Sequence, residues 1–509
     1  MDKDNAIVTA AEQASAPPPV LAPAGRRASL VGHLAWRAVA DWSSQIISWA
    51  SLLVVVRLLA PADFGLVAMC MVLYNNLRLF GDFGISTAVI TLRDLSEDEI
   101  AQLNTVGVFF GTATFFIACA CAWPLALFFR TPRLVPVVIV TSLSFLALGI
   151  RSVPDGLMSK EMRFNTLSLF NAIRDIVAAI VTLVLAFLGF GYWALVLGNV
   201  VSIFARTGLL LWTSPHRFAW PKLSMVKKPL FFSGHVVIAI YAWSTYSSLD
   251  NATAGRVLGQ AALGLYGMAW TLSNVPLEKV VSLVTSIIPS YLASVQKDPS
   301  ALKRYVANLT EALAILTFPA TIGLALVARE LIPVALGQKW NGMIVPAQVL
   351  CFYAAFRALV ALLPKVLTAV GNAKFTMRVE LTALVLMPVA FYIGSHWGLA
   401  GIAFAWVVAY PLVAAPLYWK VFQTINMRTT EYIRLIRPAL DGSIAMALAV
   451  GLIKWELSSR SRILVRLVLE ILAGAIAYIG AILLLHRERA SIFLNLLKKL
   501  KARKPSSAS

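Results

Sequence analysis

Apolar runs and short polar segments alternate along almost the whole chain. An α-helix that crosses the hydrocarbon core of a bilayer needs about 20 mostly apolar residues, and this rule predicts about fourteen such spans. They lie near residues 34–58, 66–90, 103–129, 134–150, 166–188, 193–213, 230–250, 260–291, 305–328, 344–366, 377–394, 398–420, 437–453 and 463–485. We therefore expect an all-α polytopic membrane protein.

The polar segments between these runs differ in charge. Lys and Arg are frequent near 151–163, 217–228, 297–304 and 420–434, and they are absent from 60–65, 189–192 and 395–398. Basic residues near 130, 329–339 and 454–462 are exceptions to this alternation. Because basic loops stay in the cytoplasm, the pattern predicts that both termini are cytoplasmic and that the number of spans is even.

Two pairs of segments repeat in the same order. Arg57 to Met69 reads RLLAPADFGLVAM, and Arg256 to Met268 reads RVLGQAALGLYGM, with Arg, Leu, Ala, Gly-Leu and Met at matching places. A second pair places Pro and Leu before Phe at 154–164 and again at 364–375. The alternative is that Gly, Leu and Met recur because membrane turns favour them.

A true duplication predicts two parallel six-helix repeats around a central cleft, followed by two C-terminal helices, as in many transporters. The expected division has five parts. They are a disordered cytoplasmic tail at 1–29, an N-terminal six-helix bundle at 30–215, a C-terminal six-helix bundle at 228–423, the extra helices 13 and 14 at 433–485, and a basic cytoplasmic tail at 486–509.

Composition supports a membrane protein and explains its charge. Hydrophobic residues make up 59% of the 509 and charged residues 13%, against about 25% charged in soluble domains. The net charge of +20 follows from the cytoplasmic loops and the basic tail, so we expect contact with anionic membrane lipids and no nucleic-acid partner. The four cysteines and five histidines show no metal-ligand spacing, so no metal site is expected.

Charged residues inside the spans are the candidates for function, because each costs about 2.5–3.5 kcal/mol at the helix centre unless it faces a cavity or a partner. The cationic candidates for substrate binding are Arg78, Arg174, Arg206, Arg357 and Lys279. The polar candidates for the cleft or for ion coupling are Asp41, Gln45, Asp82, Asn171, Asp175 and Glu278. We expect Arg174 and Arg357 to face the cleft. The alternatives are that Arg206 snorkels to the headgroups and that Arg78 and Asp82, four residues apart, form a structural ion pair.

An excess of arginines in a wet cleft favours an anionic substrate, and guanidinium groups suit phosphate oxygens. The chain has no Walker loop and no Gly-x-Ser-x-Gly motif, so we predict that it is not an enzyme and needs no cofactor. Energy would come from an ion gradient, with H⁺ or Na⁺ as the coupling ion, from the membrane potential, or from downhill use of the product.

Several segments resemble the polysaccharide transporter family of bacterial lipid-linked oligosaccharide flippases. They are RLLAPADFGLVAM, GDFGISTAVI, MSKEMRFN, GYWALVLGN and LEKVVSLVTSIIPSYLASVQKD. The resemblance implies the fold of the multidrug/oligosaccharidyl-lipid/polysaccharide exporter superfamily. It also implies flipping of an undecaprenyl-diphosphate-linked oligosaccharide across the bacterial inner membrane, for O-antigen, capsule or exopolysaccharide synthesis. A polysaccharide polymerase and a chain-length regulator would be partners. The cavity arginines of the family have no fixed motif position, so the site residues rest on the span argument alone.

Three other functions remain open. A cation-coupled multidrug exporter of the same superfamily would bind cations through central carboxylates. A membrane polysaccharide polymerase or ligase would carry a large catalytic loop, and the chain has none longer than about 20 residues. A scaffold for synthesis enzymes would not need the intramembrane charges, whose insertion is costly.

Overall fold

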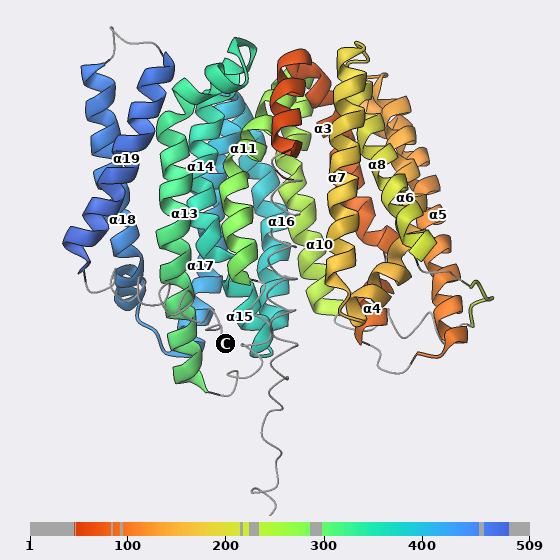
Figure 1. Cartoon of the computed structure of the whole chain (residues 1–509). Coiled ribbons are helices and arrows are strands. Elements are labelled where there is room, and N and C mark those ends of the chain that lie inside the picture. Colours follow the sequence, from red (N-terminus) through yellow and green to blue (C-terminus); the bar gives the residue numbers. More distant parts are fainter. Residues whose placement is uncertain are drawn as a thin grey trace, which may run out of the picture.

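The computed structural model describes residues 45, 47–82, 85–91, 95–213, 217–222, 234–285, 298–457 and 463–487. The side chains of Asp82, Glu278 and Lys279 lie outside this description, as do residues 1–44 with Asp41 and most of the basic tail. Within it, the regular structure is helical and contains no strand, and Figure 1 shows the helices standing side by side. The prediction of an all-α polytopic membrane protein is confirmed.

The described helices have the following order along the chain. After a helix at residues 47–58 come α3 (Pro61–Asp82), α4 (Ile85–Thr91), α5 (Glu97–Phe129), α6 (Leu134–Lys160), α7 (Phe164–Phe187) and α8 (Tyr192–Thr213). The second half contains α10 (Gly234–Thr253), η1 (Ala254–Leu258), α11 (Gln260–Thr285), α13 (Pro299–Ala335), η2 (Gln338–Met343), α14 (Ile344–Val360), α15 (Leu363–Ala369), α16 (Ala373–Ser395) and α17 (Gly398–Ile425). The last two are α18 (Thr429–Glu456) and α19 (Ile463–Leu485).

Local chemistry sets several of these boundaries. Ser96 accepts a hydrogen bond from the backbone N–H of Glu99, and the Glu99 carboxylate accepts one from the backbone of Ser96, so the two residues cap the start of α5. Asp298 caps α13 in a similar way, ahead of Pro299. Gly189 and Gly191, both with positive φ, make the tight turn between α7 and α8.

Ten helices in the described part of the chain are long and apolar enough to cross a membrane. The segments Ile47–Leu58 and Pro61–Arg78 pass the same test together, and they are bent by 119° at the break between them. Most predicted spans coincide with these helices to within a few residues. The count of fourteen and the two six-helix repeats stay predictions.

Several helices extend beyond the predicted limits, and the largest difference among the described helix ends is at the end of α6. Arg151 and Lys160 were expected in a cytoplasmic loop, but α6 continues to Lys160. The apolar run does end near residue 150, and the helix extends beyond it because Arg151 and Asp155, one turn apart, lie near each other on the same face and Asp155 also has a partner on α8.

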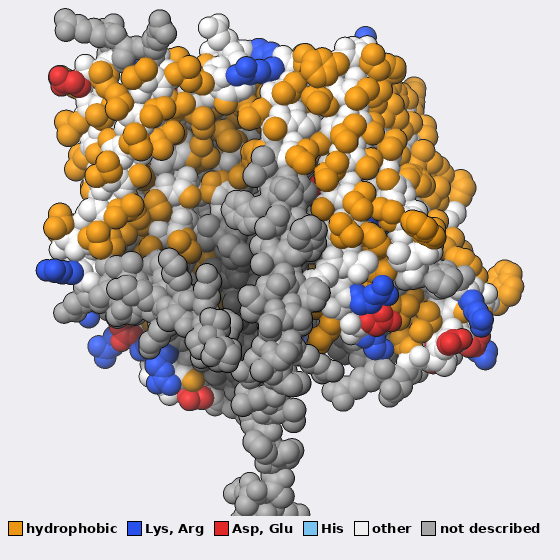
Figure 2. Space-filling model, viewed as in Figure 1, with side chains coloured by type: hydrophobic (Ala, Val, Ile, Leu, Met, Phe, Trp, Pro, Cys, Tyr) orange, Lys and Arg blue, Asp and Glu red, His pale blue; other side chains and the backbone are white. Residues whose placement is uncertain are grey.

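Two groups of helices pack side by side in Figure 1. In the first group α5 packs on α6, and α7 on α8; in the second α10 packs on α16, and α13 on α14. The main contact between the groups is α3 against α11, supported by α3 against α10, and α18 packs on both α13 and α19. Figure 2 shows hydrophobic side chains over much of the outer face, and charged side chains gathered mainly along the lower edge. This surface suits a lipid environment between two polar ends.

Candidate functional site

Arg206 on α8 is held by two side chains of neighbouring helices. Its Nη1 and Nη2 donate to the two carboxylate oxygens of Asp155 on α6, at 3.0 and 2.7 Å, and its Nε donates to Asn171 Oδ1 on α7 at 2.9 Å. Arg206 is buried, so the alternative in which it snorkels to the headgroups is wrong. The predicted residues Asn171 and Arg206 are thus brought together, and Asp155, absent from the predicted set, joins them.

Arg151 lies beside this pair, and its Nε atom lacks a hydrogen bond. Its Nε is 3.9 Å from Asp155 Oδ2, and this Nε atom is buried without a hydrogen-bond partner. Asp155 therefore faces two guanidinium groups, and it makes its short hydrogen bonds with Arg206 only. A buried donor without a partner is costly, so this arrangement is suited to a ligand that brings acceptor oxygens.

Arg174 on α7 forms an ion pair with its neighbour Asp175. Nε and Nη2 of Arg174 both donate to Asp175 Oδ1, at 3.0 and 2.6 Å. The two side chains are 39% and 38% exposed, so the helix packing does not enclose the pair. Together α6, α7 and α8 carry Arg151, Arg174 and Arg206 against two aspartates, an excess of one positive charge. We call these five residues, with Asn171, the arginine cluster.

Of the remaining predicted residues of the first half, the structure describes the side chains of Arg78 and Gln45. Arg78 on α3 is exposed, whereas Gln45 is half-buried. Because the Asp82 side chain lies outside the described residues, its ion pair with Arg78 stays a prediction. The same holds for the roles of Asp41, Glu278 and Lys279.

Arg357 on α14 has no acidic partner among the side chains that the structure describes. Its Nη1 donates to Asn274 Oδ1 on α11 at 2.8 Å. The guanidinium carbon lies 5.4 Å from the ring centre of Trp243 and 5.8 Å from that of Trp270. Aromatic faces stabilise a cation without neutralising it, so Arg357 keeps a full charge that a ligand can use. As the sequence suggested, no acid lies within one turn of it.

Two buried carboxylates of the second half were not in the predicted set. Asp250 accepts hydrogen bonds from Tyr266 and Trp406, and Glu380 accepts one from Tyr246. Asp250 lies near the end of a predicted span and Glu380 near a predicted cytoplasmic end, so neither was expected inside the helix packing. Among the described residues, no group of three or more His, Cys, Asp or Glu side chains is placed to hold a metal ion.

The two groups of helices meet at the repeated motif. A Cβ atom at Gly65 would lie 1.8 Å from the carbonyl oxygen of Gln260, and one at Gly264 would lie 1.8 Å from that of Pro61. Only glycine permits this approach of α3 and α11. Nearby, Gln260 Nε2 donates to Ala62 O at 2.7 Å. We call this region, at the top of Figure 1, the upper contact.

The two arginines that open the repeated motif make reciprocal contacts there. Arg57 donates to the carbonyl oxygens of Val334 and Ala335, at the C-terminal end of α13, at 2.6 and 3.0 Å. Arg256 donates to the carbonyl oxygen of Phe128, at the C-terminal end of α5, at 2.6 Å. Each arginine thus satisfies free carbonyl groups of a helix in the other group and interacts favourably with its dipole.

Further hydrogen bonds strengthen the same region. Trp340 Nε1 donates to Val56 O at 3.1 Å, and Lys339 Nζ donates to Arg57 O at 2.9 Å. Lower down, Thr245 Oγ1 on α10 donates to Asn76 Oδ1 on α3 at 2.8 Å. The sequence motif therefore marks the place where the halves join.

Comparisons with known proteins agree with this architecture. A family model described as polysaccharide biosynthesis protein matches residues 54–345. The lipopolysaccharide biosynthesis protein WzxC of Escherichia coli strain K12 is 24% identical over 436 residues, which cover 82% of this chain and 83% of that protein. The succinoglycan biosynthesis transport protein ExoT of Rhizobium meliloti strain 1021 is 23% identical over 501 residues, covering 94% and 96%.

The fold is also similar to a solved structure of the lipid II flippase MurJ in an inward closed conformation. The TM-score is 0.74 at 12% identity, and the match covers 89% of this chain and 99% of that one. The family model matches more than half of the chain, and its description agrees with the resemblance found in the sequence. The chain therefore belongs to the polysaccharide biosynthesis protein family.

Proposed function

We propose that the protein is a flippase, and not an enzyme, that moves an undecaprenyl-diphosphate-linked oligosaccharide across the bacterial inner membrane. The observation that carries the proposal is the arginine cluster, where three guanidinium groups share two carboxylates. Guanidinium groups bind phosphate oxygens through paired hydrogen bonds, so a diphosphate would satisfy the donors that the protein leaves free. Arg357, which is held by Asn274 and by the faces of Trp243 and Trp270, would bind a second part of the same anionic headgroup.

The relatives support this substrate class. WzxC is named for lipopolysaccharide biosynthesis, ExoT for succinoglycan transport, and MurJ for flipping lipid II. The product would then serve the synthesis of O-antigen, capsule or exopolysaccharide, where a polysaccharide polymerase and a chain-length regulator are the expected partners.

Movement would follow an alternating-access cycle. The upper contact would close one end of the space between the two groups of helices. It consists of the glycine pair and the reciprocal arginine contacts, which would break when the two groups move apart. With both termini in the cytoplasm, as the loop charges predict, this closed end faces away from the cytoplasm. Opening it while the other end closes would carry the headgroup across, while the lipid tail stays in the bilayer.

A coupling ion, H⁺ or Na⁺, would bind a buried carboxylate. Asp250 and Glu380 suit this role better than Asp175, because Asp175 already neutralises Arg174 whereas the two buried acids are held only by neutral donors. Uptake of a cation there would change the packing of α10 against α16 and α17, next to the contact between the halves.

The proposal is tested by complementing a strain that lacks the gene. Arg151→Ala and Arg174→Ala should cause lipid-linked oligosaccharide to accumulate on the cytoplasmic leaflet and should reduce surface polysaccharide, at normal protein levels. Arg378→Ala, on the exposed surface of α16, is the control and should complement fully. Full complementation by both cluster variants, or export of cationic dyes by the purified wild-type protein, would contradict the proposal and favour a multidrug exporter.

A further inference from the structure

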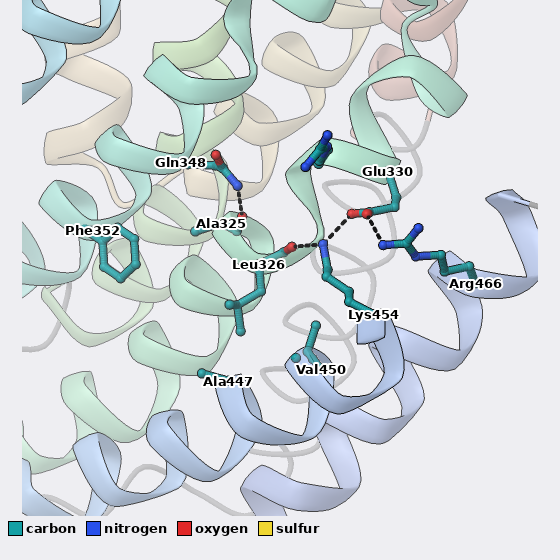
Figure 3. Close-up of a pocket in the computed structure, with 11 residues that line it drawn as sticks. Ala325, Leu326, Glu330, Gln348, Phe352, Ala447, Val450, Lys454 and Arg466 are labelled. Atoms are coloured by element: carbon teal, nitrogen blue, oxygen red, sulfur yellow. Dashed lines mark hydrogen bonds and ion pairs between the residues drawn. The ribbon is translucent and has the colours of Figure 1, made fainter. Parts of the chain in front are cut away.

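A pocket of about 750 Å³ lies between α13, α14, α18 and α19. This volume is in the range of small-molecule sites. The pocket is formed where the two C-terminal helices pack against the second half, so it is separate from the arginine cluster on α6, α7 and α8. Its lining combines charged side chains with apolar ones such as Leu326 and Phe352 (Figure 3).

Four charged side chains form a network at this place. Lys454 Nζ lies 2.6 Å from Glu330 Oε2, and Arg466 lies 3.1 Å from Glu330 Oε1 and 2.9 Å from Glu470 Oε1. The side chains of Glu330 and Glu470 are 5% and 0% exposed. Figure 3 shows Lys454 and Arg466 converging on Glu330. The two cations balance the two buried acids, so the network holds α18 and α19 against α13 and needs no further ion.

Arg329 adds a third cation to the pocket lining. Its side chain is exposed, and within the described part of the chain no hydrogen bond or ion pair joins it to another side chain. The site therefore carries one positive charge more than its acids neutralise. A phosphodiester has one negative charge and acceptor oxygens that suit a guanidinium group.

The pocket is polar near the helix ends and apolar deeper in the membrane. Arg329 lies roughly 9 Å from the C-terminal end of α13, and Lys454 roughly 3 Å from that of α18, at 1.5 Å per residue. Ala447 lies roughly 14 Å from the C-terminal end of α18. Phe352 lies roughly 12 Å from the N-terminal end of α14, the end that follows α13 in the chain. Phe352 is 50% exposed. A bilayer lipid has the same arrangement, with a charged headgroup near the membrane surface and apolar chains deeper in the membrane.

We propose that this pocket binds an anionic glycerophospholipid of the surrounding leaflet. Its phosphodiester contacts Arg329, and one acyl chain lies against Phe352 and Leu326. The lipid then forms part of the junction between the C-terminal helix pair and the second half. The proposal stands on this pocket alone and holds whether or not the arginine cluster binds a diphosphate.

Gly451 gives a steric test of the pocket. It lines the pocket on α18, and a Cβ atom placed on it would meet nothing within 4 Å. Gly451→Leu should therefore fill the pocket without a backbone clash. Gly480→Leu on α19 is the matched control, because Gly480 also faces open space but does not line the pocket. Arg329→Ala removes the charge, with Arg434→Ala, exposed near the other end of α18, as its control.

The purified, delipidated full-length proteins are titrated with phosphatidylglycerol, phosphatidylcholine or undecaprenyl phosphate, and bound lipid is counted by native mass spectrometry. The wild type and both controls should bind one phosphatidylglycerol tightly and phosphatidylcholine more weakly. Arg329→Ala should lose about tenfold in affinity, the size expected for one charge-assisted contact. Gly451→Leu, which fills the space that the lipid needs, should lose at least as much.

Two outcomes would overturn the proposal. One is equal phosphatidylglycerol affinity in the wild type, Gly451→Leu and Arg329→Ala. The other is a site that prefers undecaprenyl phosphate or does not discriminate against phosphatidylcholine. If Gly451→Leu unfolds at a lower temperature than Gly480→Leu, the surface variant Arg329→Ala decides the result by itself.

Discussion

Gly65 and Gly264 pack against each other's helices so closely that neither position has room for a side chain. Each would place a Cβ atom 1.8 Å from a backbone oxygen of the other helix. The two residues hold matching places in the repeated motif, which begins at Arg57 and again at Arg256. The contact is thus made by equivalent positions of the two motifs, and a change at either one acts on the joint between the halves.

Gly65→Val should open the upper contact, because α3 and α11 would have to move apart to remove the overlap with Gln260. The opening is measured with Ala62→Cys in a cysteine-free background, as the rate at which a membrane-impermeant reagent labels the introduced thiol. We expect faster labelling and impaired transport. Gly480→Val, where a side chain meets open space, is the control. Wild-type labelling in Gly65→Val would show that the contact does not control access.

Arg57→Ala and Arg256→Ala should each weaken the same contact, because each removes donors to the last carbonyl groups of a helix in the other half. Exposed charges at a helix end contribute about 0.3–1 kcal/mol each, so the double variant should shift the open-to-closed ratio by about three- to thirtyfold. Distances between spin labels on α5 and α13 measure the ratio. Equal distance distributions in the double variant and the wild type would rule out a role in closure.

Asp155→Asn should destabilise the protein, because it leaves the buried Arg206 guanidinium without its carboxylate partner. Removal of one partner of a buried ion pair costs about 3–5 kcal/mol. Asp155→Asn should therefore lower the unfolding temperature, and the double variant with Arg206→Met should recover part of the loss.

Arg151→Ala is the contrasting change within the arginine cluster. It should leave the unfolding temperature close to that of the wild type, because Asp155 keeps its paired hydrogen bonds to Arg206. Transport should fall nonetheless. A loss of stability as large as that of Asp155→Asn would make Arg151 a structural residue and would remove it from the proposed site.

Arg357→Lys should keep part of the transport activity, and Arg357→Ala should lose nearly all of it. Lysine preserves the charge above Trp243 and Trp270 but cannot make paired hydrogen bonds to a phosphate. Transport of lipid-linked oligosaccharide into proteoliposomes measures both variants. Trp243→Phe should reduce the rate modestly, since a smaller ring attracts a cation less strongly. Equal rates in the lysine and alanine variants would show that the charge of Arg357 plays no part.

Hydropathy and charge along the chain were enough to predict the fold class and most helix boundaries. A segment such as 463–485 forms α19 in the structure with the same limits, because a lipid-facing helix is defined by its own residues. The motif at Arg57 was also recognised as a repeated turn, because glycine and arginine stand at fixed places in it.

The partners of the charged residues depend on how the helices pack. Arg206 finds Asp155, 51 positions earlier, and Arg57 finds the end of α13, 277 and 278 positions later. Periodicity shows which face of a helix carries a charge, but it does not show which other helix that face meets. A buried charge is stable only beside its partner, so the arginine cluster, the upper contact and the charged pocket exist only once these helices are packed together.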